Sequence, residues 1–107
     1  MKDKNVKIAK KIITEEVEKA GYKLDKIILF GSRARGDYDK YSDYDFFIIL
    51  KEEFTRNTML NLISNIGLRL SRYITTDIFL KSKKKLLKEK NDIGLLSYYV
   101  LKDGVKI

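Results

Sequence analysis

Two short apolar runs, separated by a glycine turn and a polar loop, constrain this chain more than any other feature. The runs are residues 26–30 and 46–50, and each has the length and the β-branched and aromatic content of a buried strand. The segment 31–36 (Gly-Ser-Arg-Ala-Arg-Gly) follows the first run directly, and residues 42–45 (Ser-Asp-Tyr-Asp) lead into the second. The sequence therefore predicts two strands, with a glycine turn after the first and acidic side chains at the start of the second.

The composition limits the chemistry that the chain can perform. At 107 residues and 12.5 kDa, we expect a single domain over residues 1–107 with one modest core. Cysteine and histidine are both absent, so a general base must be a carboxylate, lysine or tyrosine. A bound metal would be one that prefers oxygen ligands. No apolar run approaches the roughly 20 residues of a membrane span, and we predict a cytoplasmic protein with no membrane contact.

The net charge of +8 leaves two interpretations open. Twenty-three lysine and arginine residues against fifteen acidic ones are typical of a chain that binds nucleic acid. Lysine supplies most of the charge, however, and it is scattered beside glutamate along helix-like segments, which favours a solvated surface. The lysine-rich run 82–90 has the same two interpretations, a solvated helix face or a surface that grips RNA or an acidic partner.

Hydrophobic periodicity predicts an α/β (α+β) domain with the element order α-β-β-α-β-α. We expect a short mixed sheet flanked by helices that cover one face, with a C-terminal edge strand. The predicted helices are 5–20, with Asn5 as N-cap and Gly21 as its stop, 54–72, and 83–90, with Ser82 as N-cap. The predicted strands are 24–30, 44–50 and 74–80, with 105–107 as the edge strand. Residues 93–101 favour a further helix less clearly.

The glycine turn has the residues of a phosphate-binding loop. Gly31 lets the backbone approach a ligand without a Cβ clash, and the amides after it can converge on phosphate oxygens if they open a helical turn. The Ser32 hydroxyl adds a donor, and Arg33 or Arg35 could neutralise phosphate charge. Taken alone, the same residues also suit an ordinary turn.

Three aspartates have the spacing of a metal site. Asp43 and Asp45 lie two residues apart, so on a strand they face the same side about 6–7 Å from each other. Asp77 interrupts an otherwise apolar strand, which is costly unless the carboxylate is paired or holds a metal. If that strand lies next to the second one, the three acids can hold two Mg²⁺ ions about 3.5–4 Å apart for displacement at phosphorus. The alternative is a solvated Asp-x-Asp pair, with Asp77 facing water on an edge strand.

Gly31-Ser32, ten further residues and Asp43-x-Asp45, between two apolar runs, resemble the nucleotidyltransferase superfamily related to DNA polymerase beta. The size and the motif resemble its minimal nucleotidyltransferase (MNT) branch, over roughly residues 24–80. The resemblance implies the nucleotidyltransferase fold and Mg²⁺-dependent transfer of a nucleoside monophosphate, with ATP as substrate. The resemblance places the triphosphate on Gly31 and Ser32, and two metal ions on Asp43 and Asp45.

The resemblance also implies roles for the remaining candidates and a partner. Asp77 would be the third metal-binding carboxylate and would favour deprotonation of the attacking hydroxyl, and Arg33 and Arg35 would contact phosphates. MNT proteins typically pair with HEPN-domain toxins and add AMP to a tyrosine of the toxin, which makes this chain a candidate antitoxin. Two alternatives stay open: an antitoxin that acts by complex formation without catalysis, and nucleotidyl transfer to a small molecule.

Overall fold

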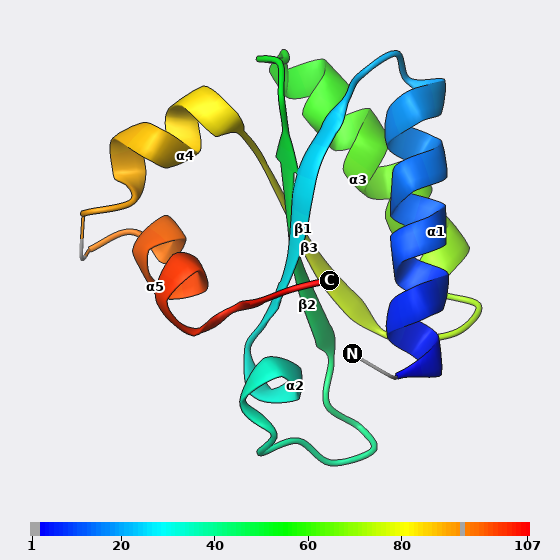
Figure 1. Cartoon of the computed structure of the whole chain (residues 1–107). Helices are drawn as coiled ribbons and strands as arrows, with labels where there is room; N and C mark the ends of the chain where they lie inside the picture. The colour runs from blue at the N-terminus through cyan, green and yellow to red at the C-terminus, as the bar shows by residue number, and fades with distance from the viewer. Residues whose placement is uncertain (1–2, 93) are drawn as a thin grey trace.

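The computed structural model of the chain (Figure 1) describes residues 3–92 and 94–107. These residues form five helices and four strands. In chain order they are α1 (Lys4–Lys19), β1 (Leu24–Phe30), α2 (Ser32–Arg35), β2 (Tyr44–Leu50), α3 (Arg56–Leu70), β3 (Thr76–Ser82), α4 (Lys83–Glu89), α5 (Leu96–Asp103) and β4 (Val105–Lys106).

The strands form one mixed sheet in the order β3-β2-β1-β4. β1 pairs antiparallel with β2 and with β4, whereas β2 and β3 run parallel. The predicted mixed sheet is confirmed, and β1 and β2 have the predicted bounds. The predicted C-terminal edge strand is present as β4, and β3 forms the other edge of the sheet.

Several predicted element ends were wrong by about two residues, and α3 covers Arg56–Leu70 rather than the predicted 54–72. The N-cap of α1 is Asp3, not Asn5, because the Asp3 carboxylate accepts a hydrogen bond of 2.8 Å from the Asn5 amide. β3 covers 76–82 rather than 74–80, because its parallel pairing with β2 begins at Thr76. The expected cap of α4 is confirmed, since the Ser82 hydroxyl accepts a 3.2 Å bond from the Lys85 amide.

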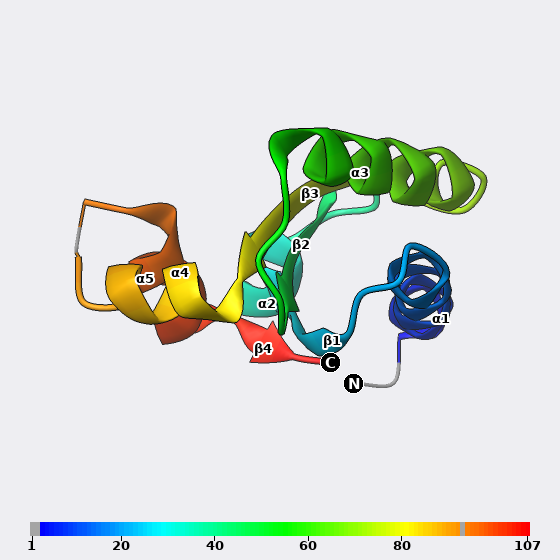
Figure 2. The same cartoon turned by 90° about the horizontal axis from the view of Figure 1, so that it is seen from above.

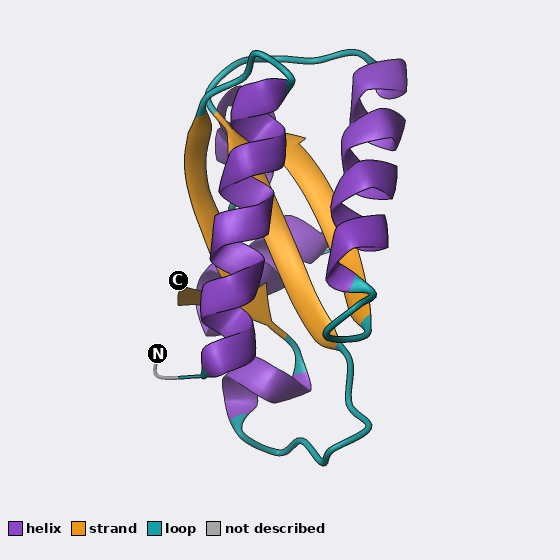
Figure 3. Ribbon diagram, turned by 90° about the vertical axis from the view of Figure 1, so that its right-hand side faces the viewer, coloured by secondary structure: helices purple, strands orange, loops and turns teal. Residues whose placement is uncertain are grey.

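Helices cover both faces of the sheet, so the expectation of one covered face was wrong. Figure 2 shows α1 and α3 on one side and α4 and α5 on the other, and Figure 3 shows α1 and α3 side by side over the strands. Phe46 and Ile48 of β2 pack in the cluster under α1 and α3. Phe47 and Ile49 pack in a second cluster with Leu86 of α4 and Val100 of α5. Because β2 is apolar on both faces, both faces have to be covered.

Candidate functional site

The structure brings two of the predicted acids side by side. Asp45 of β2 and Asp77 of β3 are direct register partners on parallel strands, and adjacent strands lie about 4.8 Å apart. Asp43 stands immediately before β2, close enough for its charge to act on Asp45. Asp77 is exposed on an edge strand, which was one of the two alternatives for this residue. It also lies next to the Asp-x-Asp pair, as the other alternative required.

The acids act on each other electrostatically. Burial raises the pKa of Asp45 first, and the negative charges of Asp77 and Asp43 and a hydrogen bond with Asp77 raise that pKa further. The positive charge of Arg35 lowers it in part. A cluster of carboxylates whose charges disfavour one another is a place where a cation gains free energy.

Gly31 lies directly against this cluster. Its φ of 72° is in the left-handed region, and a Cβ atom added there would stand 2.1 Å from Oδ2 of Asp45. The position therefore accepts only glycine without displacement of the carboxylate. Gly31 is also the N-cap of α2.

The expected helical turn after Gly31 is present as α2. The Ala34 and Arg35 amides both donate to the Gly31 carbonyl, at 3.1 Å. The first amides of a helix, here those of Ser32 and Arg33, have no partner within the helix. The turn therefore has backbone donors directly after Gly31, the residue that lies against Asp45, and such donors suit a phosphate group next to a metal ion.

The two arginines of the turn have different surroundings. The Arg33 guanidinium donates to the Ser42 carbonyl through Nε (3.3 Å) and Nη2 (3.2 Å). It also lies 4.3 Å from the ring centroids of both Tyr38 and Tyr44. Tyr44 faces the α1 side of the sheet, opposite to Asp45, because successive strand residues alternate. Arg33 is thus directed away from the acids, whereas Arg35 is close enough to influence Asp45.

A connection that the sequence did not reveal fixes the start of β2. The Tyr44 hydroxyl donates to Oδ2 of Asp3 at 2.9 Å, so the residue that caps α1 also holds the residue between Asp43 and Asp45. Burial raises the pKa of Tyr44 above its usual range, which keeps this donor protonated. The available signal was Asp3 itself, since aspartate one turn before an apolar periodic segment is a strong N-cap.

Asp43, Asp45 and Asp77 supply the carboxylate oxygens that Mg²⁺ prefers. The mutual repulsion at Asp45 fits a group that carries positive charge. Among the described residues, no three acidic side chains are already arranged around one metal position. The three-carboxylate metal site, and the nucleotide contacts of Gly31, Ser32, Arg33 and Arg35, therefore stay predictions.

Comparison with known proteins shows the family to which the chain belongs. The family model of the nucleotidyltransferase domain matches residues 7–103. A Methanocaldococcus jannaschii protein named as a protein adenylyltransferase is 42% identical over 65 residues. That alignment covers 58% of this chain and 66% of the relative, so it spans slightly less than two thirds of the relative's length.

Two solved structures share the fold. One, a toxin–antitoxin structure with AMP-PNP, has a TM-score of 0.60 at 20% identity, over 90% of this chain and 69% of the other. The other is a Sulfolobus solfataricus protein named as a nucleotidyltransferase, with a TM-score of 0.55 at 24% identity, over 98% and 87% of the two chains. The predicted nucleotidyltransferase fold is thus confirmed, and the family match identifies the chain: it belongs to the nucleotidyltransferase domain family.

Proposed function

We propose that this chain is an enzyme that transfers AMP from ATP to a hydroxyl group of a partner protein, with release of pyrophosphate. The observation that carries the proposal is the meeting of Asp45, Asp77 and Gly31 at one end of the sheet. The family match supports a nucleotidyltransferase, and the relative named as a protein adenylyltransferase supports AMP and a protein acceptor.

In this proposal Asp43, Asp45 and Asp77 hold Mg²⁺, with two ions during the reaction. When bound, the metal would neutralise charge that develops on the phosphoryl and pyrophosphate oxygens. The Ser32 amide and hydroxyl bind the triphosphate, and Gly31 lets it approach the acids. Arg35 is the better placed of the two arginines for a phosphate contact, since it is the one that acts on Asp45.

We further propose a toxin of the HEPN type as the partner and one of its tyrosines as the acceptor, which gives the chain an antitoxin role. The resemblance to MNT proteins and the toxin–antitoxin structure that shares the fold support this partner. A cytoplasmic location is part of the proposal, because ATP is available there.

The first test is label transfer from ATP to a co-purified partner protein in the presence of Mg²⁺. We expect label from the α-phosphate, and none from the γ-phosphate, to reach the partner, and chelation of Mg²⁺ to stop transfer. Asp45→Asn should lower the rate at least about 100-fold, since the loss of several kcal/mol of charge stabilisation costs tenfold for each 1.4 kcal/mol. The matched control is Glu18→Gln, which removes one negative charge, as Asp45→Asn does, but at an exposed position on α1.

The same assay separates the alternatives. A tight complex with the partner and no transfer would favour an antitoxin that acts by binding alone. Transfer from ATP to a small hydroxyl compound, but not to the partner, would favour the small-molecule reaction. An active Asp43→Asn/Asp45→Asn variant would refute the assignment of the site.

A further inference from the structure

A groove lies at the end of the sheet opposite to the acids. It has a volume of about 580 Å³ and is lined by the first turn of α3, the C-terminal end of β3 and α4. Asp77 and Ser82 stand at opposite ends of β3, and five residues of strand span about 16 Å. A ligand in the groove would therefore leave the acids and the Gly31 turn free.

The floor of the groove is apolar. Phe54, Met59 and Leu80 line it, and Leu80 is buried. The Phe54 ring packs edge-on against Tyr22, with 6.5 Å between ring centroids, so its orientation is fixed. Methionine beside these residues can adapt to apolar side chains of different shapes.

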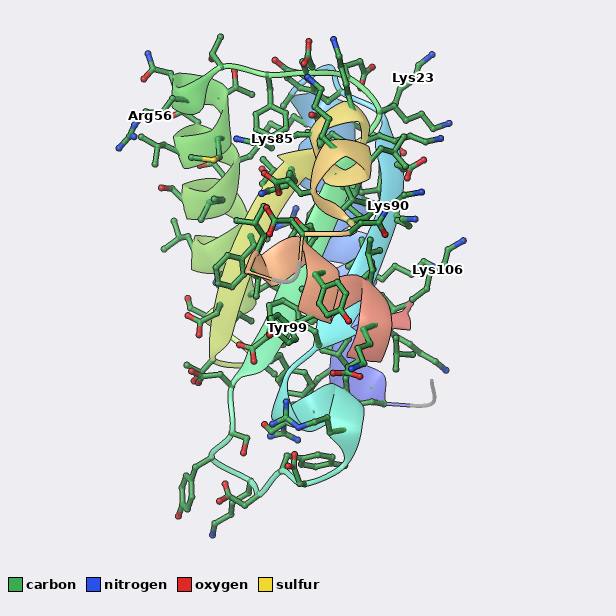
Figure 4. All side chains as sticks on the ribbon, turned by 90° about the vertical axis from the view of Figure 1, so that its left-hand side faces the viewer. Lys23, Arg56, Lys85, Lys90, Tyr99 and Lys106 are labelled. Carbon is green, nitrogen blue, oxygen red and sulfur yellow. The ribbon has the colours of Figure 1, made fainter. Side chains whose placement is uncertain are left out.

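The rim of the groove is basic. Arg56 from α3 and Lys84, Lys85 and Lys88 from α4 line it. Figure 4 shows Arg56 on the first turn of α3 and Lys85 between α4 and α3. In the part of the chain that the structure describes, none of these four cations lies within 4.0 Å of a carboxylate.

The two acids that line the groove leave the rim with an excess of positive charge. Glu89 is paired with Lys81 and also accepts a 2.9 Å hydrogen bond from the Ser97 hydroxyl, so its charge is already compensated. Glu53 is exposed, and its single negative charge is outnumbered by the four positive charges of the rim. A ligand with several negative charges therefore has more than one partner here.

We propose that this groove binds an acidic amphipathic segment of a partner protein. Its apolar side chains would lie on Phe54, Met59 and Leu80, and its carboxylates would pair with the four cations of the rim. An apolar floor inside a charged rim is the arrangement that receives one face of an amphipathic helix. This binding does not depend on the proposed nucleotidyl transfer, because the groove shares no residue with that site.

The lining favours protein over nucleic acid. Single-stranded RNA is held by bases stacked on exposed aromatic faces. Among the described residues that line the groove, Phe54 is the one aromatic residue, and it is already packed on Tyr22. The exposed carboxylate of Glu53 would repel a phosphate backbone, whereas a protein segment can place an apolar or polar residue beside it.

The test uses fluorescence anisotropy with a labelled helical peptide of about 15 residues, with leucine at i, i+3, i+4 and i+7 and glutamate elsewhere. We expect the peptide to bind, and Lys84→Glu/Lys88→Glu to weaken binding about tenfold or more, equal to about 1.4 kcal/mol. Both lysines are exposed, and Lys84→Gln/Lys88→Gln should give a smaller loss of the same kind. The control is Lys10→Glu/Lys11→Glu on α1, exposed lysines with the same change of net charge, which should leave binding within about twofold.

Three results would overturn the proposal. The peptide could fail to bind, or the α1 control could lose as much affinity as the groove variant, which would mean attraction by net charge alone. A single-stranded RNA could bind more tightly than the peptide and lose affinity in the same groove variant, which would make the groove a nucleic-acid site. Nucleotide binding measured in parallel keeps a failure here distinct from a failure of the proposed transfer reaction.

Discussion

At the scale of single residues, Gly31 and Asp45 define the candidate site together. The carboxylate of Asp45 occupies the space that a side chain at position 31 would need. The positive φ of Gly31 directs the chain from β1 into α2. The backbone donors that follow Gly31 and the Asp45 carboxylate thus have no side chain of residue 31 between them, which suits a site for a metal-bound phosphate.

The contact at Gly31 can be tested with a matched pair of glycines. Gly31→Ala should abolish most nucleotidyl transfer, because the new Cβ displaces Asp45, and should cost about 1–3 kcal/mol of stability. Gly36 also has a positive φ, 90°, but has open space around it. Gly36→Ala should therefore show the backbone cost alone and keep most of the activity. Urea denaturation and the label-transfer assay measure the two effects, and equal activity losses would contradict the contact argument.

The raised pKa of Asp45 predicts how stability depends on pH. Between the ordinary aspartate pKa of about 3.9 and the raised value, the folded chain keeps a proton that the unfolded chain has released. The contribution of Asp45 to the free energy of unfolding therefore falls as pH rises through that interval. Asp45→Asn should remove this fall and, at neutral pH without divalent metal, stabilise the chain by about 0.5–1 kcal/mol, the size of a cross-strand charge effect.

Urea denaturation over a series of pH values checks this prediction, with Glu18→Gln as a control of equal charge. We expect an Asp45→Asn variant that is more stable but inactive, which would indicate that Asp45 serves function at a cost in stability. A less stable variant would show that Asp45 serves the fold instead.

At the scale of elements, Arg33 joins α2, the loop 36–43 and β2. Its bonds to the Ser42 carbonyl and its place between Tyr38 and Tyr44 hold the loop whose last residue is Asp43. The start of β2 is held from the other side by Asp3 of the α1 cap. Asp43 and Asp45 thus stand on a segment fixed at both ends, which is how a site keeps its geometry before a ligand arrives.

Arg33→Lys separates a structural role from a phosphate contact. Lysine keeps the charge but loses the planar stacking and the two-donor bond, so we expect a loss of about 1–2 kcal/mol in the free energy of unfolding. Proteolysis within residues 36–43 should become faster, while the KM for ATP changes little.

The control for that variant is Arg35→Lys. Arg35 is exposed and forms a surface ion pair with Asp37 at 3.4 Å, so stability should be nearly unchanged and the KM for ATP should rise. An Arg33→Lys variant with unchanged stability but a raised KM for ATP would instead indicate that Arg33 contacts the nucleotide.

At the scale of the whole molecule, the sheet separates two cores that are secured differently. The α1 and α3 side carries the larger apolar cluster. The α4 and α5 side has a smaller cluster and adds a polar connection, in which Glu89 of α4 pairs with Lys81 of β3 and accepts from Ser97 of α5. These bonds lower the pKa of Glu89, so its stabilising contribution is present above the ordinary glutamate pKa and is lost as pH falls through the lowered value.

Glu89→Gln tests whether the two cores are stabilised separately. We expect a loss of about 1–2 kcal/mol, as for a hydrogen bond to a charged group, together with faster hydrogen exchange in α4 and α5. Exchange in α1 and α3 should stay as in the unchanged chain, because those helices pack in the other core. Faster exchange throughout the molecule would contradict two separately secured cores.

The sequence by itself determined the elements whose signals are local. Apolar runs fixed β1 and β2 to the residue, Gly31 marked the turn that opens α2, and Ser82 marked the start of α4. Asp43 and Asp45 could be recognised as a pair because a strand puts alternate residues on one side whatever its partners are.

Only the tertiary structure decided the relations between elements that lie far apart in the chain. Parallel pairing of β2 with β3 put Asp77 beside Asp45, and the alternation of Tyr44 and Asp45 turned Arg33 away from the acids. The tertiary structure also placed α4 and α5 over the second face of the sheet and formed the basic groove between α3 and α4. The physical reason is that periodicity and turn chemistry act within a few residues, whereas register, strand order and the choice of a covered face depend on contacts between distant segments.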